Sequence, residues 1–264
     1  MTQTPSFPLL DHPAFRGVSE ASVTRLEASC RVLRFELGGQ LSDSNNIAAR
    51  ILVILKGKAR LVGRHHGRLT TVGKYGPGSV IGAASLLCGA PCENVIAAEE
   101  VIACAISDEL WRELYASEAS FRQWCDQQLW PQELLKLLEA LEQTTPEADS
   151  SALEKLENAL QSAERCSPDQ ASVDAALAAG KRLYVTSAWG DLTFGQPVCT
   201  AMDLPACEPF SLRLVSLPSS EFSNQAGKTP GNVSGSLVSA SSIQEAEVLP
   251  PVSSFSPERN VVDT

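Results

Sequence analysis

Short apolar and β-branched runs separated by glycine dominate the first third of the chain after its opening segment. Runs of this length, bounded by turn residues, predict β-strands. We expect strands at residues 32–37, 50–55, 58–64, 69–75 and 94–106. Ahead of them, Ser19 precedes Glu20, Val23 and Leu26 at helical spacing, which predicts a capped helix within residues 15–30.

The period of the pattern changes at Ser107, which two acidic residues follow. A serine N-cap with acidic residues in the first turn predicts a helix start, because the helix dipole favours negative charge there. A second helix is expected at about residues 118–129. Trp130-Pro131 then predicts a break, since the residue before a proline disfavours helical backbone. We therefore expect a first domain to cover residues 1–130.

Helical patterns continue to residue 179, and short strands follow. We expect helices at 133–142, 151–165 and 168–179, and strands at 183–187, 192–194 and 212–217. Ser151 and Glu154 have capping-box spacing, Pro168 suits a first helical position, and Gly180 supplies a stop. Residues 131–218 are thus predicted to form a small α+β unit. Residues 219–264 are rich in Ser, Pro and Gly, which predicts a disordered linker or tail.

Charge and hydropathy narrow the class of protein. The chain has 21 Lys and Arg against 31 Asp and Glu, a net charge of −10, which disfavours non-specific binding of nucleic acid or of an anionic membrane. No apolar run reaches the length of about 18 residues that a transmembrane helix needs. The first ten residues lack Lys and Arg and so do not resemble a secretory signal. We expect a cytoplasmic protein without direct membrane insertion.

The cysteines and histidines offer little metal chemistry. The eight cysteines are spread through apolar segments, as expected for buried, reduced thiols. Cys88 and Cys92 are the one suggestive pair, but the histidines are His12, His65 and His66, and the last two fall at a predicted hairpin turn. We therefore expect no metal and no cofactor.

Residues 75–97 read YGPGSVIGAASLLCGAPCENVIA, a glycine-spaced turn, a short apolar run, a second turn and a strand. A short helix start between two strands can hold an anion such as phosphate, because its free amides and dipole favour negative charge. The alternative is a tight connection between barrel strands with no ligand.

Residues 15–129 resemble the cyclic nucleotide-binding domains of bacterial catabolite activator proteins and of regulatory subunits of cyclic-AMP-dependent protein kinase. The segments that carry the resemblance are Gly38-Gly39-Gln40, residues 54–61 (ILKGKARL), Gly76-Pro77-Gly78, and the cassette segment, residues 82–87 (GAASLL). The resemblance implies an α+β fold in which an eight-stranded, jelly-roll-like β-roll carries flanking helices. It also implies that the cassette segment is the phosphate-binding part of the site.

The sequence departs from the family pattern at both ligand-binding positions. In the family, a glutamate after the cassette glycine binds the ribose 2′-hydroxyl, and this position holds Ala83 here. An arginine after the following turn binds the cyclic phosphate in the family, and this position holds Cys92 here. Glu93 adds negative charge where a phosphate belongs. Loss of one partner of a buried charge pair costs about 2–5 kcal/mol, so cyclic nucleotide binding is doubtful. The vestigial pocket comprises Gly82, Ala83, Ala84, Ser85, Leu86, Pro91, Cys92 and Glu93.

Four cations on the predicted strands are the candidate replacements for the missing arginine. They are Arg50, Lys56, Lys58 and Arg60. Long cationic side chains on barrel strands usually keep their charged ends in water. We therefore expect these side chains to point outward.

The order of segments suggests a narrower relative. A roll followed by YVTSAWGDLTFGQPV, RLVSLP and a Ser/Pro-rich stretch resembles the N-terminal regulatory portion of cyanobacterial, peptidase-containing ATP-binding-cassette exporters of type I secretion. This resemblance implies a membrane transporter, or the rest of a longer transporter chain, as partner.

Two functions remain open. The first is a non-enzymatic regulatory or interaction module with a degenerate nucleotide pocket. The second is a sensor that binds a cyclic nucleotide or another metabolite through the amides of residues 82–85. A transcription factor is disfavoured, because the helices after residue 130 are acidic and offer no basic recognition helix. An enzyme is disfavoured, since the sequence holds no nucleophile elbow, metal-spaced histidine pair or complete P-loop.

Overall fold

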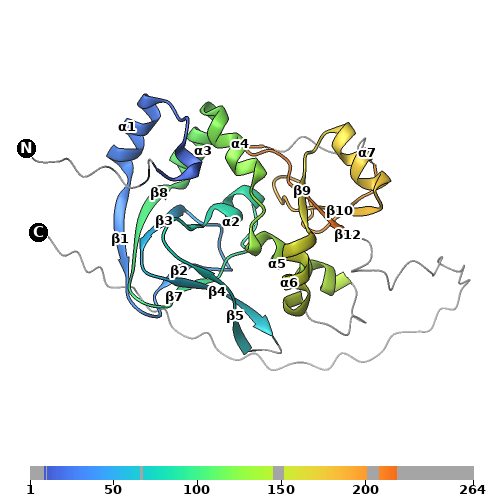
Figure 1. Cartoon of the computed structure of the whole chain (residues 1–264), viewed down its shortest axis with the longest axis horizontal. Helices are drawn as coiled ribbons and strands as arrows, with labels where there is room; N and C mark the ends of the chain where they lie inside the picture. The colour runs from blue at the N-terminus through green and yellow to red at the C-terminus, as the bar shows by residue number, and fades with distance from the viewer. Residues whose placement is uncertain (1–8, 10, 66–67, 145–151, 201–207, 219–264) are drawn as a thin grey trace, which may run out of the picture. The chain divides into compact units, whose positions relative to one another are not determined.

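The computed structural model describes residues 9, 11–65, 68–144, 152–200 and 208–218, and these belong to one compact unit (Figure 1). A 3-10 turn, η1 (Pro13–Phe15), precedes helix α1 (Glu20–Ser29). Ser19 caps α1, because its hydroxyl accepts the N–H of Ser22 at 3.4 Å. The predicted helix is therefore confirmed, with its start at the expected cap.

Two four-stranded antiparallel sheets follow and form a roll. The strand order of one sheet is β1 (Arg31–Phe35), β8 (Val101–Ser107), β3 (Arg50–Lys56) and β6 (Val80–Ile81). The strand order of the other sheet is β2 (Gln40–Ser42), β7 (Val95–Ala97), β4 (Ala59–His65) and β5 (Arg68–Tyr75). The predicted run at 94–106 is two strands, because the chain turns between β7 and β8. Strands β2 and β6 were not predicted, since two or three residues are too short to show a period.

Helices close the roll on one side (Figure 1). The short helix α2 (Ala83–Cys88) connects β6 to β7, and α3 (Asp108–Ser117) and α4 (Ala119–Gln127) follow β8. Ser107 caps α3 by accepting the N–H of Leu110 at 3.2 Å, as predicted. The rings of Phe15, Trp111 and Phe121 pack at the centre of this layer, with 4.8 Å between the centroids of the last two. The expected antiparallel sheets with flanking helices are thus confirmed.

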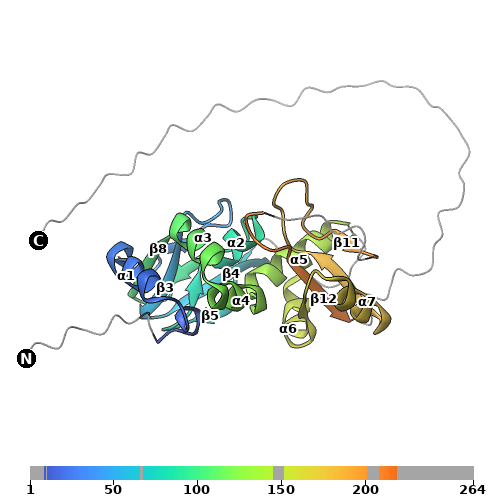
Figure 2. The ribbon, with the colours of Figure 1, turned by 90° about the horizontal axis from the view of Figure 1, so that it is seen from above.

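Helix α5 (Pro131–Thr144) starts where the break was predicted and carries the chain into residues 131–218, which we call the second unit. Its sheet is the third in the chain, and we call it the second sheet to distinguish it from the two sheets of the roll. This sheet is antiparallel, and its strand order is β11 (Pro197–Val198), β10 (Lys181–Val185), β12 (Leu214–Pro218) and β9 (Glu164–Cys166). Two helices belong to the same part of the chain, α6 (Ala152–Ser162) and α7 (Gln170–Ala178). Figures 1 and 2 both place α5 between the roll and this sheet.

The structure corrects several predictions in the second half. The helix expected at 151–165 ends at Ser162, and β9 follows it. The strand expected at 192–194 is absent from that described segment, and β11 lies further on. Asp169 caps α7 by accepting the N–H of Ser172 at 2.9 Å, so Pro168 precedes the cap and is not the first helical residue. Ser151 and residues 219–264 lie outside the described residues.

Candidate functional site

The carboxylate of Glu93 occupies the amino-terminal end of α2. Gly82 is the N-cap of this helix and has no side chain that could cap it. Glu93 accepts the N–H of Gly82 at 2.7 Å and the N–H of Ser85 at 3.0 Å, and it is fully buried. A carboxyl group of the chain itself therefore occupies the helix start, the place that the sequence indicated could hold an anion.

Gly82 fixes the position of these amides. Its φ is +95°, and a Cβ atom there would lie 2.8 Å from the carbonyl oxygen of Arg50. Only glycine adopts this conformation readily and fits this close approach. The site therefore depends on the backbone at Gly82 and on a carboxylate eleven residues later.

Burial raises the pKa of Glu93 above its ordinary value, although hydrogen bonds from the Gly82 and Ser85 amides and from Gln132 oppose this effect. The side-chain nitrogen of Gln132 lies 3.4 Å from Glu93 Oε2. Gln132 belongs to the first turn of α5 and is itself buried. Helix α5 thus covers the carboxylate.

The structure brings the other predicted pocket residues together around α2. Ala83, Ala84, Ser85 and Leu86 form the helix and are buried, and Cys92 is buried beside it; Pro91, in the turn between, is half-buried. Ser85 Oγ lies 3.2 Å from the amide nitrogen of Ala48 and 3.0 Å from the carbonyl oxygen of Gly82. Burial and a hydrogen bond with the Cys88 thiol raise the pKa of Cys92.

No cation faces Glu93 among its hydrogen-bond partners in the described part of the chain. Arg50, Lys56, Lys58 and Arg60, the candidate replacements for a phosphate-binding arginine, are all exposed to solvent. The position expected to hold the arginine carries the neutral thiol of Cys92. A second anion brought to these amides would therefore meet a carboxylate, with no opposing positive charge from these side chains.

The second unit holds the carboxyl-terminal end of the same helix. The Ala188 amide donates to the Cys88 carbonyl at 2.7 Å, and the indole Nε1 of Trp189 donates to the Leu87 carbonyl at 3.3 Å. Gly89 follows the helix with φ +64°, and a Cβ atom there would lie 2.8 Å from the Trp189 ring. The sequence pattern around Trp189 gave no sign of its contact with α2.

A buried ion cluster joins α5 to the second sheet. Arg213 donates to Glu133 through two nitrogens, Nη2 to Oε2 at 2.6 Å and Nε to Oε1 at 3.0 Å, and Thr186 Oγ1 donates to Oε1 at 2.5 Å. Burial alone would raise the pKa of Glu133, but the guanidinium groups of Arg213 and Arg165 outweigh it and hold the pKa below its usual value. Sequence reasoning missed this cluster, because its residues are far apart in the chain.

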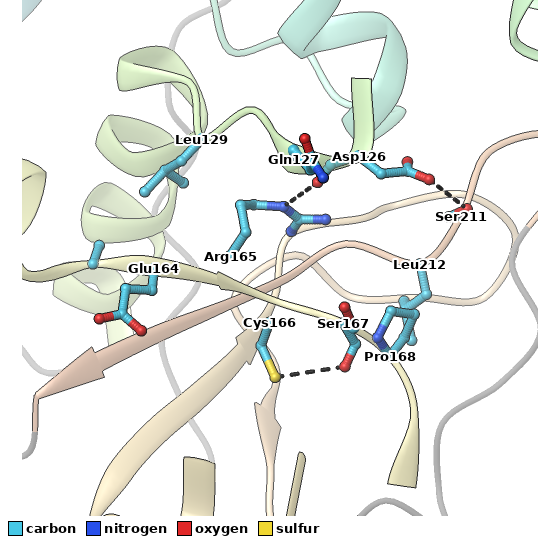
Figure 3. Close-up of a pocket in the computed structure, with 11 residues that line it drawn as sticks. Asp126, Gln127, Leu129, Glu164, Arg165, Cys166, Ser167, Pro168, Ser211 and Leu212 are labelled. Atoms are coloured by element: carbon cyan, nitrogen blue, oxygen red, sulfur yellow. Dashed lines mark hydrogen bonds between the residues drawn. The ribbon is translucent and has the colours of Figure 1, made fainter. Parts of the chain in front are cut away.

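A hollow of about 530 Å³ lies beside this cluster, lined by residues of α4, β9 and the segment before β12 (Figure 3). Arg165 Nε donates to the Asp126 carbonyl at 3.2 Å, and Ser211 Oγ donates to the Asp126 carboxylate at 3.2 Å. Tyr115 Oη lies 2.8 Å from the same carboxylate. These polar groups are partnered within the protein, so their contacts link secondary-structure elements.

The family comparison concerns the roll and its short helix α2. Residues 32–118 match the model of the family described as "Cyclic nucleotide-binding domain". The match runs from β1 to the end of α3 and includes the cassette segment. This part of the chain is therefore similar to a cyclic nucleotide-binding domain. No curated protein matches the chain.

Several solved structures are similar. One is the regulatory subunit of a cAMP-independent protein kinase A from Trypanosoma brucei, with 20% identity over 46% of this chain and 45% of that chain and a TM-score of 0.41. The match thus spans less than half of that relative. Another is the N-terminal domain of a transcriptional regulator from Streptomyces coelicolor A3(2), with 19% identity, 55% and 99% coverage and a TM-score of 0.38. A third is the sensor domain of the transcriptional regulator DNR from Pseudomonas aeruginosa, with 14% identity, 54% and 92% coverage and a TM-score of 0.41.

Within the described residues, no helix combines the length and apolar character that crossing a bilayer requires.

Proposed function

We propose that this protein is a non-enzymatic regulatory and interaction module whose nucleotide cassette is closed by its own Glu93. The observation that carries the proposal is the buried carboxylate on the amides of Gly82 and Ser85. A cyclic phosphate needs those amides, so it must first displace Glu93. Displacement would leave Glu93 without the hydrogen bonds that support it, and Cys92 provides no charge to attract the phosphate.

The contacts of α2 support a structural use of the cassette. The Glu93 carboxyl group accepts hydrogen bonds from amides at the amino-terminal end of the helix, and Ala188 and Trp189 donate hydrogen bonds to carbonyls at its carboxyl-terminal end. A cassette that responds to a ligand must change its contacts when the ligand arrives. Here protein groups already fill both ends, which favours a fixed platform for the second unit.

We further propose that the module acts on an ATP-binding-cassette exporter, either as a separate protein or as part of a longer transporter chain. The support is the order of segments, a roll followed by residues 184–198 and then by 213–218. Both later segments contact the roll or its connecting helix, through Trp189 and Arg213. A unit with these contacts is suited to pass a change in the roll to whatever follows it.

Calorimetric titration of the full chain with cyclic AMP and cyclic GMP tests the closed cassette. We expect no heat of binding for the wild type. The triple variant Ala83→Glu, Cys92→Arg, Glu93→Ala restores both family ligand positions and vacates the amides, so it should bind.

The matched control is Ala83→Glu, Cys92→Arg with the exposed Glu99→Ala, which leaves Glu93 in place. It should bind far more weakly than the triple variant. Micromolar binding by the wild type would overturn the closed cassette. If none of the three proteins binds either nucleotide, residues 83 and 92 are not the family's ligand positions.

A further inference from the structure

One segment of this acidic protein has only positive formal charges. Residues 44–92 contain seven Lys and Arg and neither Asp nor Glu, whereas the whole chain has a net charge of −10. Three of these cations, Lys58, Arg60 and Lys74, lie on or directly beside the β4–β5 hairpin and have exposed side chains. We call these three side chains the basic surface.

The backbone brings the basic surface together. Arg60 of β4 and Lys74 of β5 are direct cross-strand partners, as the register of the hairpin shows. Lys58 lies directly before β4, two residues ahead of Arg60, and its side chain is exposed. A cross-strand pair of positive charges therefore has a third positive charge close to it along the chain.

The side chains of the basic surface are not ion-paired. Lys58, Arg60 and Lys74 form no ion pair within the described residues. The turn between β7 and β8 carries Glu99, whose amide donates to the Lys58 carbonyl at 3.3 Å, and Glu100, which is paired with Arg34. Like charges directly opposite each other weaken a sheet. An external anion would remove this repulsion.

We propose that the basic surface docks the protein on an anionic lipid bilayer. Charges further than a Debye length, about 8 Å at physiological salt, are largely screened, so the local positive charge decides the attraction despite the net charge of the chain. Leu69, near the turn of the same hairpin, is 56% exposed and can enter the headgroup boundary.

The composition of the hairpin favours a lipid surface over a nucleic acid. Tyr75, the last residue of β5, is the one Phe, Tyr or Trp in the sequence of β4 and β5, and it is partly buried. Single-stranded nucleic acids are usually held by aromatic rings on which bases stack. The hairpin instead offers charge with an exposed aliphatic side chain, a combination suited to headgroups.

Co-sedimentation of the full chain with vesicles tests the proposal. We expect binding to phosphatidylcholine vesicles that contain phosphatidylserine, no binding to phosphatidylcholine alone, and release at high salt. Each cation near an anionic leaflet changes the partition coefficient about fivefold. Arg60→Gln with Lys74→Gln should therefore lower binding roughly 30-fold.

The matched control is Arg16→Gln with Arg31→Gln, which removes the same charge from two exposed positions, one directly after η1 and one in β1. It should change vesicle binding much less than the hairpin variant, and circular dichroism of both variants should match the wild type. The proposal is overturned if the wild type does not sediment with phosphatidylserine vesicles, or if both variants bind equally. It is also overturned if a single-stranded oligonucleotide binds through Arg60 and Lys74 while vesicles do not.

Discussion

Glu93 shows how one side chain can change the chemistry of a site without changing its backbone. Replacing Glu93 with Ala leaves the buried amides of Gly82 and Ser85 without an acceptor. An unsatisfied buried donor costs about 1–3 kcal/mol, so we expect the free energy of unfolding to fall by about that amount. Inorganic phosphate should restore part of it by binding the vacated amides, which thermal unfolding with and without phosphate will measure.

The control for this prediction is Glu99→Ala, which removes an exposed carboxylate from the turn between β7 and β8. Its melting temperature should respond to phosphate as the wild type does. Equal stabilisation of all three proteins by phosphate would contradict a site that opens only when Glu93 is removed.

Gly89 and Trp189 give a second test at single residues. Gly89→Ala adds a Cβ atom 2.8 Å from the Trp189 ring at a φ of +64°, whereas Gly180→Ala adds one at φ +73° with nothing within 4 Å. Both variants should lose about 1–2 kcal/mol from the left-handed backbone, and Gly89→Ala should lose more because of the ring. Chemical denaturation measures both losses.

A double variant separates the two causes. Adding Trp189→Ala removes the ring that the new Cβ atom meets. The extra loss of Gly89→Ala over Gly180→Ala should then shrink. If it does not, the close approach of Trp189 is not its cause.

The sequence predicted that Glu93 conflicts with a bound phosphate, but it could not predict the contact between Trp189 and α2. Glu93 lies next to the position where the resemblance places an arginine, so its conflict with a phosphate is visible in the sequence. Trp189 lies 102 residues from Leu87, whose carbonyl it contacts. A local pattern carries no information about such a pairing.

At the scale of elements, α5 is the connection that matters most. Its consecutive residues Gln132 and Glu133 have different partners, because Gln132 donates to Glu93 beside α2 and Glu133 binds Arg213, directly before β12. A shift of this first turn would change both contacts together. The sequence predicted where α5 starts, from Pro131, but not these contacts.

Arg213→Ala tests the junction at α5. The variant leaves Glu133 buried without its bidentate partner, and breaking a buried pair costs about 3–5 kcal/mol. The pKa of Glu133 is lowered in the folded protein, so its stabilising contribution is present above the pKa of the unfolded chain and is lost as pH falls through the folded pKa. The deficit of the variant should therefore be largest near neutral pH and shrink in acid.

Urea unfolding at pH 7 and pH 4 checks this prediction. Glu133→Leu with Arg213→Met replaces both charges by apolar groups and should recover much of the loss at pH 7. A deficit that is the same at both pH values would contradict a role for the Glu133 charge.

The limits of sequence reasoning at this scale follow from strand length. The strands β3, β4 and β5 have seven or eight residues and show a clear apolar pattern. The strands β6 and β11 have two residues each, and they are strands because they pair with β3 and β10. For this reason the longer strands of the roll were predictable, whereas β6 of the roll and β11 of the second sheet were not.

At the scale of the whole molecule, the second unit completes the core of the roll. Phe210 is 1% exposed, and its ring centroid lies 4.8 Å from that of Tyr115 in α3. Trp189 packs against the same cluster. The predicted boundary after residue 130 therefore separates segments that share a core, and the sequence could not show this because the shared residues are distant.

Shared packing predicts that the described unit unfolds in one step. Removal of a buried phenylalanine costs about 3–5 kcal/mol, so Phe210→Ala should destabilise the roll although the substitution lies outside it. Tryptophan fluorescence, which reports mainly on the roll through Trp111, Trp124 and Trp130, should lose its signal at the same denaturant concentration as circular dichroism.

A chain cut after Trp130 should melt at a lower temperature, because it lacks Phe210, Trp189 and the cover from Gln132. Two separate transitions in the full chain, with the first unchanged by Phe210→Ala, would mean that the roll is stable without its neighbour and that the cassette does not depend on the second unit.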